Sequence, residues 1–292
     1  MSVDTVTPDH LALDAFAAAT ADDMATIDFS SLVGLLNEPN MPSGGGATIR
    51  RVVDLARLRR GSRVLEVGSN TGYTSIEFAS WIDGQVTGLD INPVSTAFAR
   101  AKAARCGLRN VRFDVGDGQN LPYPDGSFDL VYCSNVTSFI DDHRQARDEY
   151  YRVLADGGLL VAVPIYYHTA PPEDLRRRVG EAIGVDLAVT SQQYWSDLFA
   201  DPRACLLERE TYEYERQPPD RIAAYVERVL DQPHLLAIDP SVRDAAAARL
   251  SYFYRLFDEN LSYARYDILV YRRDHPNPEP VLHTTRRVGS DR

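Results

Sequence analysis

The most informative stretch of this sequence is Arg63-Val-Leu-Glu-Val-Gly-Ser-Asn-Thr-Gly72. Its first half is an apolar run that predicts a short buried strand. Gly68 and Gly72 then permit a tight turn, and residues 73–80 have the pattern of the first turns of a helix. A strand, a glycine turn and a helix N-terminus are together typical of a nucleotide-binding corner, because free backbone N–H groups and the positive end of the helix dipole meet there.

The spacing of the glycines distinguishes between nucleotide cofactors. A dinucleotide fingerprint has the form Gly-x-Gly-x-x-Gly, and counted from Gly68 it needs glycines at positions 70 and 73. This chain has Asn70 and Tyr73 there. It has instead an acidic residue, one apolar residue, a glycine, three further residues and a second glycine, which are Glu66-Val-Gly68 and then Gly72.

This arrangement resembles motif I of the class I S-adenosylmethionine-dependent methyltransferases, in which Asp or Glu precedes a Gly-x-Gly-x-Gly loop. Asn70 replaces the middle glycine. Asparagine adopts the left-handed backbone region more readily than most residues, so we expect the turn to survive. A strand, turn and helix that bind nothing would have the same pattern, and the motif alone leaves that alternative open.

An acidic residue also follows the next predicted strand. Residues 86–90 form this strand, and Asp90 stands at its end. In nucleotide folds of this kind, a carboxylate at this place accepts hydrogen bonds from both ribose hydroxyls, because it offers two acceptor oxygens. The alternative is that Asp90 caps the helix expected at residues 93–105, a role that Asn92 could also fill.

A second stretch resembles the same family. After a predicted strand at residues 111–115, the chain continues Gly116-Asp-Gly-Gln-Asn-Leu-Pro-Tyr-Pro-Asp-Gly-Ser-Phe-Asp-Leu-Val-Tyr132. Many small-molecule methyltransferases have a Gly-Asp-Ala-x-x-Leu-Pro-Phe run here, then Asp-x-Ser-Phe-Asp and a strand. The resemblance implies that Asp117 accepts from the adenine amino group, and that the end of the following strand faces the transferred methyl group.

The resemblance therefore implies S-adenosyl-L-methionine as the cofactor and S-adenosyl-L-homocysteine as its product. Its three ordered matches span roughly residues 60–165. The cofactor-binding residues that it implies are Glu66, Gly68, Asn70, Gly72, Tyr73, Asp90, Ile91, Asp117, Gly118, Gln119, Ser134 and Asn135.

The expected fold is α/β, with a Rossmann-like, seven-stranded, mostly parallel sheet and helices on both faces. An N-terminal helical lid and Gly-rich loop are expected at residues 1–46, the cofactor-binding core at 47–165, an acceptor-side region at 166–273 and a loose tail at 274–292. Within the first segment, apolar spacing predicts two short helices in residues 9–37 with a break near residues 20–23. The Gly-rich loop at 37–46 is compatible with a lid or with a plain linker.

Within the core, a helix is expected at 47–60, a helix-ending turn at Asp156-Gly-Gly158 and a fifth strand at 159–165. Beyond it we expect helices at 173–184, 191–200, 219–231 and 240–261, and strands at 204–216 and 266–272. The last two helices are an insertion before the final strand, and they should either cap the acceptor pocket or form a homodimer contact.

Tyr167 and His168 are the candidate catalytic residues. They follow the fifth strand, and open α/β sheets place their ligands at the carboxyl ends of the strands. A histidine beside a tyrosine can accept a proton from a hydroxyl or amine nucleophile. The alternative is that both only form the wall of the acceptor pocket.

The composition of the chain indicates which binding partners and which cellular location to expect. The chain has 42 acidic and 31 basic residues and no basic block, which is a poor electrostatic match for nucleic acid or an anionic membrane. Cys106, Cys133 and Cys205 show no spacing typical of a metal site or a disulfide framework, so we expect no metal. The N-terminal residues lack the features of a signal peptide, and no apolar run is long enough to span a bilayer. These observations predict a cytoplasmic protein.

The function that follows is methyl transfer from S-adenosylmethionine to a small organic molecule, with bacterial secondary metabolism as a possible setting. Two alternatives stay open: a methyltransferase acting on a protein or RNA, and a fold that binds the cofactor without transferring its methyl group.

Overall fold

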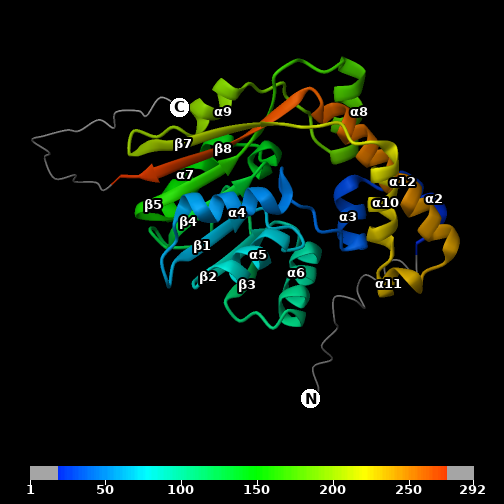
Figure 1. The fold of residues 1–292 in the computed structure, drawn as a ribbon, viewed down its shortest axis with the longest axis horizontal. Helices are drawn as coiled ribbons and strands as arrows, with labels where there is room; N and C mark the ends of the chain where they lie inside the picture. The colour runs from blue at the N-terminus through cyan, green and yellow to red at the C-terminus, as the bar shows by residue number, and fades with distance from the viewer. Residues whose placement is uncertain (1–18, 275–292) are drawn as a thin grey trace, which may run out of the picture.

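The computed structural model describes residues 19–274. A mixed sheet with flanking helices lies at one end of the molecule, and a body of helices lies at the other (Figure 1). The strands of the sheet are β1 (Arg63–Val67), β2 (Gln85–Asp90), β3 (Val111–Val115), β4 (Phe128–Ser134), β5 (Leu154–Val163), β6 (Ile165–Tyr167), β7 (Ala204–Glu213) and β8 (Ala264–Arg273).

The strand order confirms the expected fold. Along the sheet the strands follow β3-β2-β1-β4-β5-β8-β6, and β7 pairs with β8 as well. The five strands from β3 to β5 run parallel, whereas β8 is antiparallel to β5, β6 and β7. The sheet has one strand more than expected, because Pro164 separates β5 from the short β6. Proline has no N–H to continue a ladder, so the expected strand at 159–165 is divided there.

Helices cover both faces of the sheet. Because side chains alternate along a strand, Leu65 and Val131 pack on one face, with α7 (His143–Val153) and α9 (Gln192–Phe199). Val64 and Leu130 pack on the opposite face, in the cluster that includes α4 (Gly45–Ala56) and α5 (Tyr73–Trp81). A smaller cluster adds α6 (Pro93–Arg105) to this second face.

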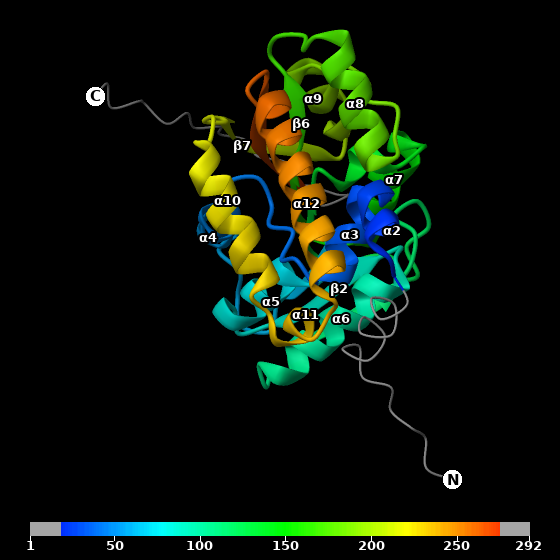
Figure 2. The same ribbon diagram turned by 90° about the vertical axis from the view of Figure 1, so that its right-hand side faces the viewer.

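The remaining helices form a body that we call the helical cap, and it has a hydrophobic core of its own. Figure 2 shows α12 crossing the middle of this body with α10, α3 and α8 around it. The members of the cap are α2 (Ala21–Thr26), α3 (Phe29–Leu36), α8 (Glu173–Ile183), α10 (Pro219–Leu230), α11 (Pro233–Leu236) and α12 (Pro240–Leu261). The insertion expected before the last strand is therefore present as α10, α11 and α12, and it packs against the N-terminal helices.

Several boundaries differ from the sequence-based expectations. Helix α2 starts at Ala21, inside the expected break, because Thr20 caps it and forms a reciprocal capping box with Asp23. Helix α4 begins at Gly45 and ends at Ala56, earlier than expected at both ends. The turn expected at 156–158 lies within β5, and β7 ends at Glu213. The expected helical pattern before residue 19 and the tail at 275–292 lie outside the described residues.

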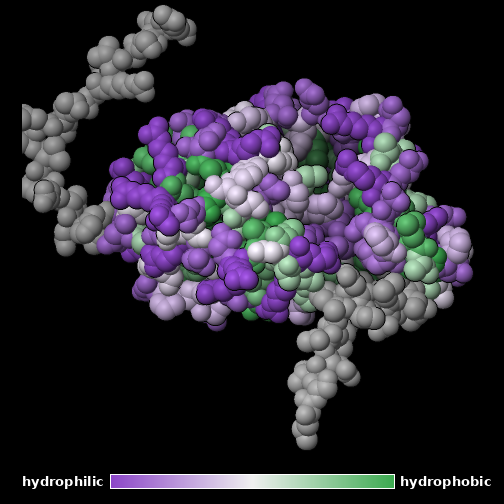
Figure 3. Space-filling view, turned by 60° about the horizontal axis from the view of Figure 1, so that its bottom comes forward, coloured by the Kyte–Doolittle hydropathy of each residue, from purple (hydrophilic) through white to green (hydrophobic). Residues whose placement is uncertain are grey.

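The surface is mostly hydrophilic on the face that Figure 3 shows, where apolar residues lie in small separate groups. The large apolar side chains that are exposed come from different elements, for example Ile91, Val189 and Leu236. No helix within residues 19–274 combines the length and the apolar character needed to cross a membrane.

Candidate functional site

The turn after β1 has the conformation that its sequence predicts. Gly68, Asn70 and Gly72 have φ values of 80°, 44° and 85°, so Asn70 does adopt the left-handed region in place of a glycine. The backbone N–H groups of Gly68 and Ser69 donate to the carbonyl oxygen of Leu89 at 2.8 and 3.0 Å, which joins the turn to the end of β2. A Cβ atom at Gly68 would lie only 2.5 Å from a methyl carbon of Val136, so the chain after β4 also meets this turn.

Asp90 binds the backbone of the turn. One of its carboxylate oxygens accepts from the N–H of Asn70 at 2.8 Å, and the other accepts from the N–H of Asn92 at 2.8 Å. Burial raises the pKa of this carboxyl, and the two N–H groups oppose that shift. The cap of α6 is Asn92, whose side chain accepts from residues 94 and 95. Each Asp90 oxygen keeps a second lone pair, which leaves acceptor capacity for a ligand.

Glu66 points into the protein core. It is 4% exposed, accepts a hydrogen bond from the Ser75 hydroxyl on α5, and lies on the same sheet face as Tyr132. Burial raises the pKa of Glu66 to about 7. The side chain of Glu66 therefore connects the start of α5 to β1, which are the two elements on either side of the Gly68–Gly72 turn.

The loop after β3 brings Asp117, Gly118 and Gln119 to the same edge of the sheet. The N–H of Gln119 donates to the Asp117 carboxylate at 2.9 Å. A Cβ atom at Gly118 would lie 3.1 Å from a methyl carbon of Val67, at the end of β1, so this loop and the Gly68–Gly72 turn are close neighbours.

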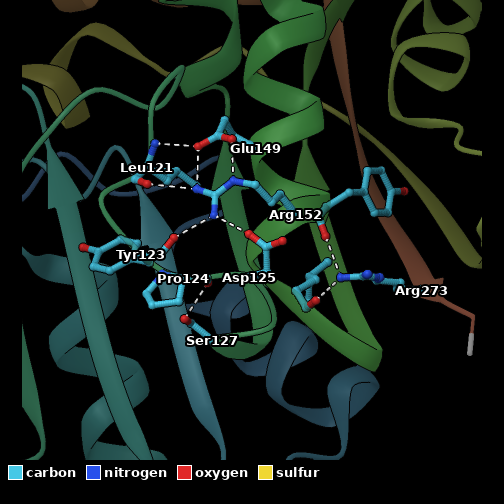
Figure 4. A network of polar contacts seen from close by, with 10 residues as sticks. Leu121, Tyr123, Pro124, Asp125, Ser127, Glu149, Arg152 and Arg273 are labelled. Atoms are coloured by element: carbon cyan, nitrogen blue, oxygen red, sulfur yellow. Dashed lines mark hydrogen bonds and ion pairs between the residues drawn. The ribbon is translucent and has the colours of Figure 1, made fainter. Parts of the chain in front are cut away.

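Arg152 on α7 fixes the continuation of this loop (Figure 4). Its guanidinium donates to the carbonyl oxygens of Leu121 and Tyr123 at 2.9 and 2.7 Å, and to Asp125 at 2.9 Å. Glu149, one turn earlier, binds the same guanidinium and accepts from the N–H of Leu121 at 2.8 Å. Side chains of α7 therefore hydrogen-bond to backbone groups of this loop that would otherwise bind water.

The segment after β4 borders a narrow crevice. Ser134 ends β4, and Asn135 has a φ of 53° and accepts from the Ser138 hydroxyl at 2.9 Å. The crevice has no room for a water molecule, and its lining residues are Cys133, Asn135, Thr137, Ser138, Pro164, Trp195 and Phe199.

The other two predicted binding residues flank the turn. Ile91 follows Asp90 directly and is 72% exposed, an unusual place for a large apolar side chain. Tyr73 is the first residue of α5 and is half-buried. Its hydroxyl lies 3.7 Å from the position that a Cβ atom would take at Gly46.

Tyr167 and His168 lie at the far end of β6, beside the end of α12. The Tyr167 hydroxyl donates to the Asn260 side chain at 3.0 Å, and burial raises its pKa. The exposed His168 ring pairs with the neighbouring Thr169 hydroxyl at 3.0 Å. Within the described residues, no hydrogen bond joins either side chain to the Gly68–Gly72 turn. The two residues are on the expected edge of the sheet, and their catalytic role stays a prediction.

The structure also brings residues to the turn that sequence reasoning missed. The Thr71 hydroxyl donates to the carbonyl oxygen of Glu38 at 2.8 Å, and the Lys102 ammonium lies 3.4 Å from the same hydroxyl. The segment 37–46 therefore lies against the turn. Two buried oxygens here have no hydrogen-bond partner among the described residues, namely those of the Asn37 amide and the Ser69 hydroxyl. The sequence carries no local signal for these contacts.

The fold is a Rossmann-like domain in which the Gly68–Gly72 turn, Asp90 and Asp117 meet at the carboxyl ends of neighbouring strands. We call this place the cofactor corner. Residues 65–162 match the family model described as a methyltransferase domain. The demethylmenaquinone methyltransferase of Thermus thermophilus is 40% identical over 115 residues, which cover 39% of this chain and 52% of that protein. The matched region is about half the length of the curated relatives.

Solved structures agree on the fold. The crystal structure of MccD protein has a TM-score of 0.67 at 22% identity and covers 80% of this chain and 100% of that one. The crystal structure of the [4+2]-cyclase SpnF has a TM-score of 0.57 at 23% identity, with coverage of 78% and 80%. The match of residues 65–162 to a methyltransferase domain agrees with the resemblance drawn from the sequence, and the solved structures agree with the fold that it implies.

Proposed function

We propose that this protein transfers a methyl group from S-adenosylmethionine to a small organic molecule. The observation that carries the proposal is the convergence of the Gly68–Gly72 turn, Asp90 and Asp117 at one edge of the sheet, inside the region that matches the family model. Parallel α/β sheets place their ligands at this edge.

The chemical groups at the corner suit this cofactor. The N-terminus of α5 favours a carboxylate such as that of the methionine part. Asp90 has spare acceptor capacity for the ribose hydroxyls, Asp117 for the adenine amino group, and the exposed Ile91 offers an apolar surface to the adenine ring. The unpaired oxygens of Asn37 and Ser69 are consistent with a ligand at this place.

The cofactor supplies an activated methyl group on a sulfonium. The chain then has to hold the acceptor in line with the breaking bond and to exclude water, and positioning of this kind contributes on the order of 7–11 kcal/mol. Tyr167 and His168 are the proposed acceptor-side residues. Tyr167→Phe and His168→Ala should leave cofactor binding intact and lower turnover, and unaltered turnover in both would remove them from the site.

A small acceptor is favoured over RNA by the formal net charge of −11, which repels a polyanion. The curated relatives with named substrates include an ajmaline N-methyltransferase from Rauvolfia serpentina, which is 32% identical over 133 residues. A cytoplasmic location and a homodimer are further proposals, and the second is tested by the native mass of the purified protein.

Calorimetric titration with S-adenosylmethionine, S-adenosylhomocysteine and NAD tests the proposal. We expect micromolar binding of the two sulfur compounds and no binding of NAD. Absence of binding by both sulfur compounds would contradict the proposal. Where they bind, a panel of small-molecule, peptide and RNA acceptors with labelled S-adenosylmethionine separates a small-molecule enzyme from a macromolecular one. Transfer to none of them would favour a fold that binds the cofactor without transferring its methyl group.

A further inference from the structure

Glu38 is a buried carboxylate at the place where three parts of the molecule meet. It is 2% exposed, although it lies in the Gly-rich segment that joins α3 to α4. Burial of a carboxylate is costly unless hydrogen bonds satisfy it. Its partners therefore identify what the structure holds in place here.

The side chain of Glu38 binds the helical cap. One carboxylate oxygen accepts from the Tyr225 hydroxyl on α10, and the other accepts from the N–H of Asn40 at 2.5 Å. Burial and the nearby Glu38 carboxylate raise the pKa of Tyr254 on α12, and the Tyr254 ring packs edge to face on that of Tyr225 with 5.3 Å between centroids. The carboxylate thus binds α10 directly and reaches α12 through the contact between the two tyrosine rings.

The backbone of Glu38 binds the cofactor corner. Its carbonyl oxygen accepts from Thr71, which stands between Asn70 and Gly72 in the turn. Lys102 on α6 donates to the same Thr71 hydroxyl at 3.4 Å, and its charge is attracted to that of Glu38. One residue therefore contacts the turn through its main chain and the cap through its side chain.

Helix α12 extends this connection toward the acceptor side. Tyr254 and Asn260 lie on the same helix, separated along its axis by about 9 Å at the rise of an α-helix. Asn260 accepts from Tyr167, and the N–H of His168 donates to the carbonyl oxygen of Tyr263, just after α12. A shift of α12 would therefore move the partners of both acceptor-side residues.

We propose that Glu38 is a positioning residue that couples binding at the cofactor corner to the order of α10 and α12. A bound cofactor would fix the 68–72 turn, the turn would fix residue 38, and residue 38 would fix α10 and α12. Of these two helices, α12 contacts Tyr167 through Asn260. This inference rests on the proposed function, because it requires the corner to bind S-adenosyl compounds. It predicts that bound cofactor strengthens binding of the acceptor.

Hydrogen exchange with S-adenosylhomocysteine as the probe tests this coupling without any knowledge of the acceptor. In the unmodified protein, saturating probe should slow amide exchange in residues 66–72, and also about tenfold in residues 219–230 and 240–261. In Glu38→Gln, the probe should still bind and protect residues 66–72, but the slowing in α10 and α12 should be lost. Glu227→Gln, an exposed glutamate on α10, is the matched control and should behave like the unmodified protein.

A second variant tests the same coupling in case Glu38→Gln does not fold. Tyr225→Phe keeps the ring and removes only the hydroxyl, and it should reduce the same coupling, whereas Tyr252→Phe on the outer side of α12 should not. Two outcomes would overturn this inference and leave the proposed function intact. In the first, the probe binds the unmodified protein but does not slow exchange in α10 and α12. In the second, the probe slows exchange in α10 and α12 of both Glu38→Gln and Tyr225→Phe as much as in the unmodified protein. Failure of the probe to bind the unmodified protein would overturn the proposed function, and the inference with it.

Discussion

At the residue scale, Asp90 is expected to serve both the fold and the ligand. It accepts from two backbone N–H groups at 2.8 Å, one in the turn and one before α6. Replacing it with alanine leaves both donors without this partner and removes the acceptors proposed for the ribose. We expect Asp90→Ala to weaken binding of S-adenosylhomocysteine by about 1–3 kcal/mol and to lower the free energy of unfolding by a similar amount.

Calorimetry and urea unfolding separate these two effects. Asp90→Asn keeps one carbonyl oxygen as an acceptor. Its affinity for S-adenosylhomocysteine and its free energy of unfolding should therefore decrease less than those of Asp90→Ala. If Asp90→Ala lowered only the stability and left the affinity unchanged, the ribose role would be wrong and Asp90 would be a structural residue of the turn.

The buried Glu66 predicts a pH dependence of stability. Burial raises its pKa from the ordinary value of 4.5 to about 7. The folded protein therefore holds a proton that the unfolded chain releases above pH 4.5. The contribution of Glu66 to the free energy of unfolding is fully present below that pH, falls as the pH rises to about 7, and is constant above it. The total loss is on the order of 3 kcal/mol.

Urea unfolding of the ligand-free protein at pH 5, 6, 7 and 8 measures this dependence. Glu66→Gln removes the titrating group, so it should gain stability relative to the unmodified protein as the pH rises. The exposed Glu227→Gln should follow the unmodified protein. Parallel curves for Glu66→Gln and the unmodified protein would show that burial does not shift the pKa of this carboxyl as described.

The turn was predictable residue by residue, whereas its neighbours were not. The conformations of Gly68, Asn70 and Gly72 depend on local backbone preferences, which a short stretch of sequence contains. The contacts of Glu38 depend on Thr71 and Tyr225, which are 33 and 187 positions away. No short-range pattern distinguishes such a glutamate from an exposed one.

At the scale of elements, Arg152 joins α7 to the loop that carries Asp117–Gln119. Its guanidinium binds two loop carbonyls and Asp125, and it is partly exposed. Arg152→Ala should lower the free energy of unfolding by roughly 2 kcal/mol, because the loop carbonyls lose charged donors. It should also weaken binding of S-adenosylhomocysteine, since the proposed adenine contacts are in the same loop.

Exchange rates of the amides in residues 117–127, together with urea unfolding, measure this change. Arg144→Ala provides the control on the same helix, because the Arg144 side chain is exposed. Equal effects of the two substitutions would mean that the loop keeps its conformation without Arg152.

Element types were predicted better than their ends. Apolar periodicity locates strands and helices, but caps and neighbouring strands set their limits. Helix α2 begins at Ala21 because of the Thr20–Asp23 capping box. Strand β5 begins at Leu154 because this residue pairs with Phe128 of β4, and the register then shifts, so the intervening residues stay in the strand. Pairing of this kind involves a partner that the local sequence does not specify.

At the scale of the whole molecule, the sheet and the helical cap have separate cores, so each should respond separately to a cavity. Phe253 is 0% exposed and contacts Phe29 and Phe257, with ring centroids 5.6 and 6.1 Å away. Phe253→Ala should cost about 3–5 kcal/mol. Hydrogen exchange should show the loss in α8, α10 and α12, whereas β1 to β5 should stay protected. Tyr252→Ala, with an exposed ring on the same helix, should change little.

Uniform loss of protection across cap and sheet in Phe253→Ala would contradict this division into two cores. The sequence predicts a helix at residues 240–261, but it does not identify the helices that pack against it. The α2 and α3 helices that pack on it are more than 200 residues earlier in the chain, and only the folded arrangement brings Phe29 to Phe253.

The place of β8 in the sheet has a consequence for synthesis of the chain. Strand β7 pairs with β8, which follows it only after all of α10, α11 and α12. During translation, β7 therefore leaves the ribosome before its partner exists, and β5 also has an open edge toward the β8 position. Unpaired edges are templates for association with other chains. Slow decoding across residues 214–263 should thus promote aggregation of nascent chains, and a chaperone that covers exposed strand edges should suppress it.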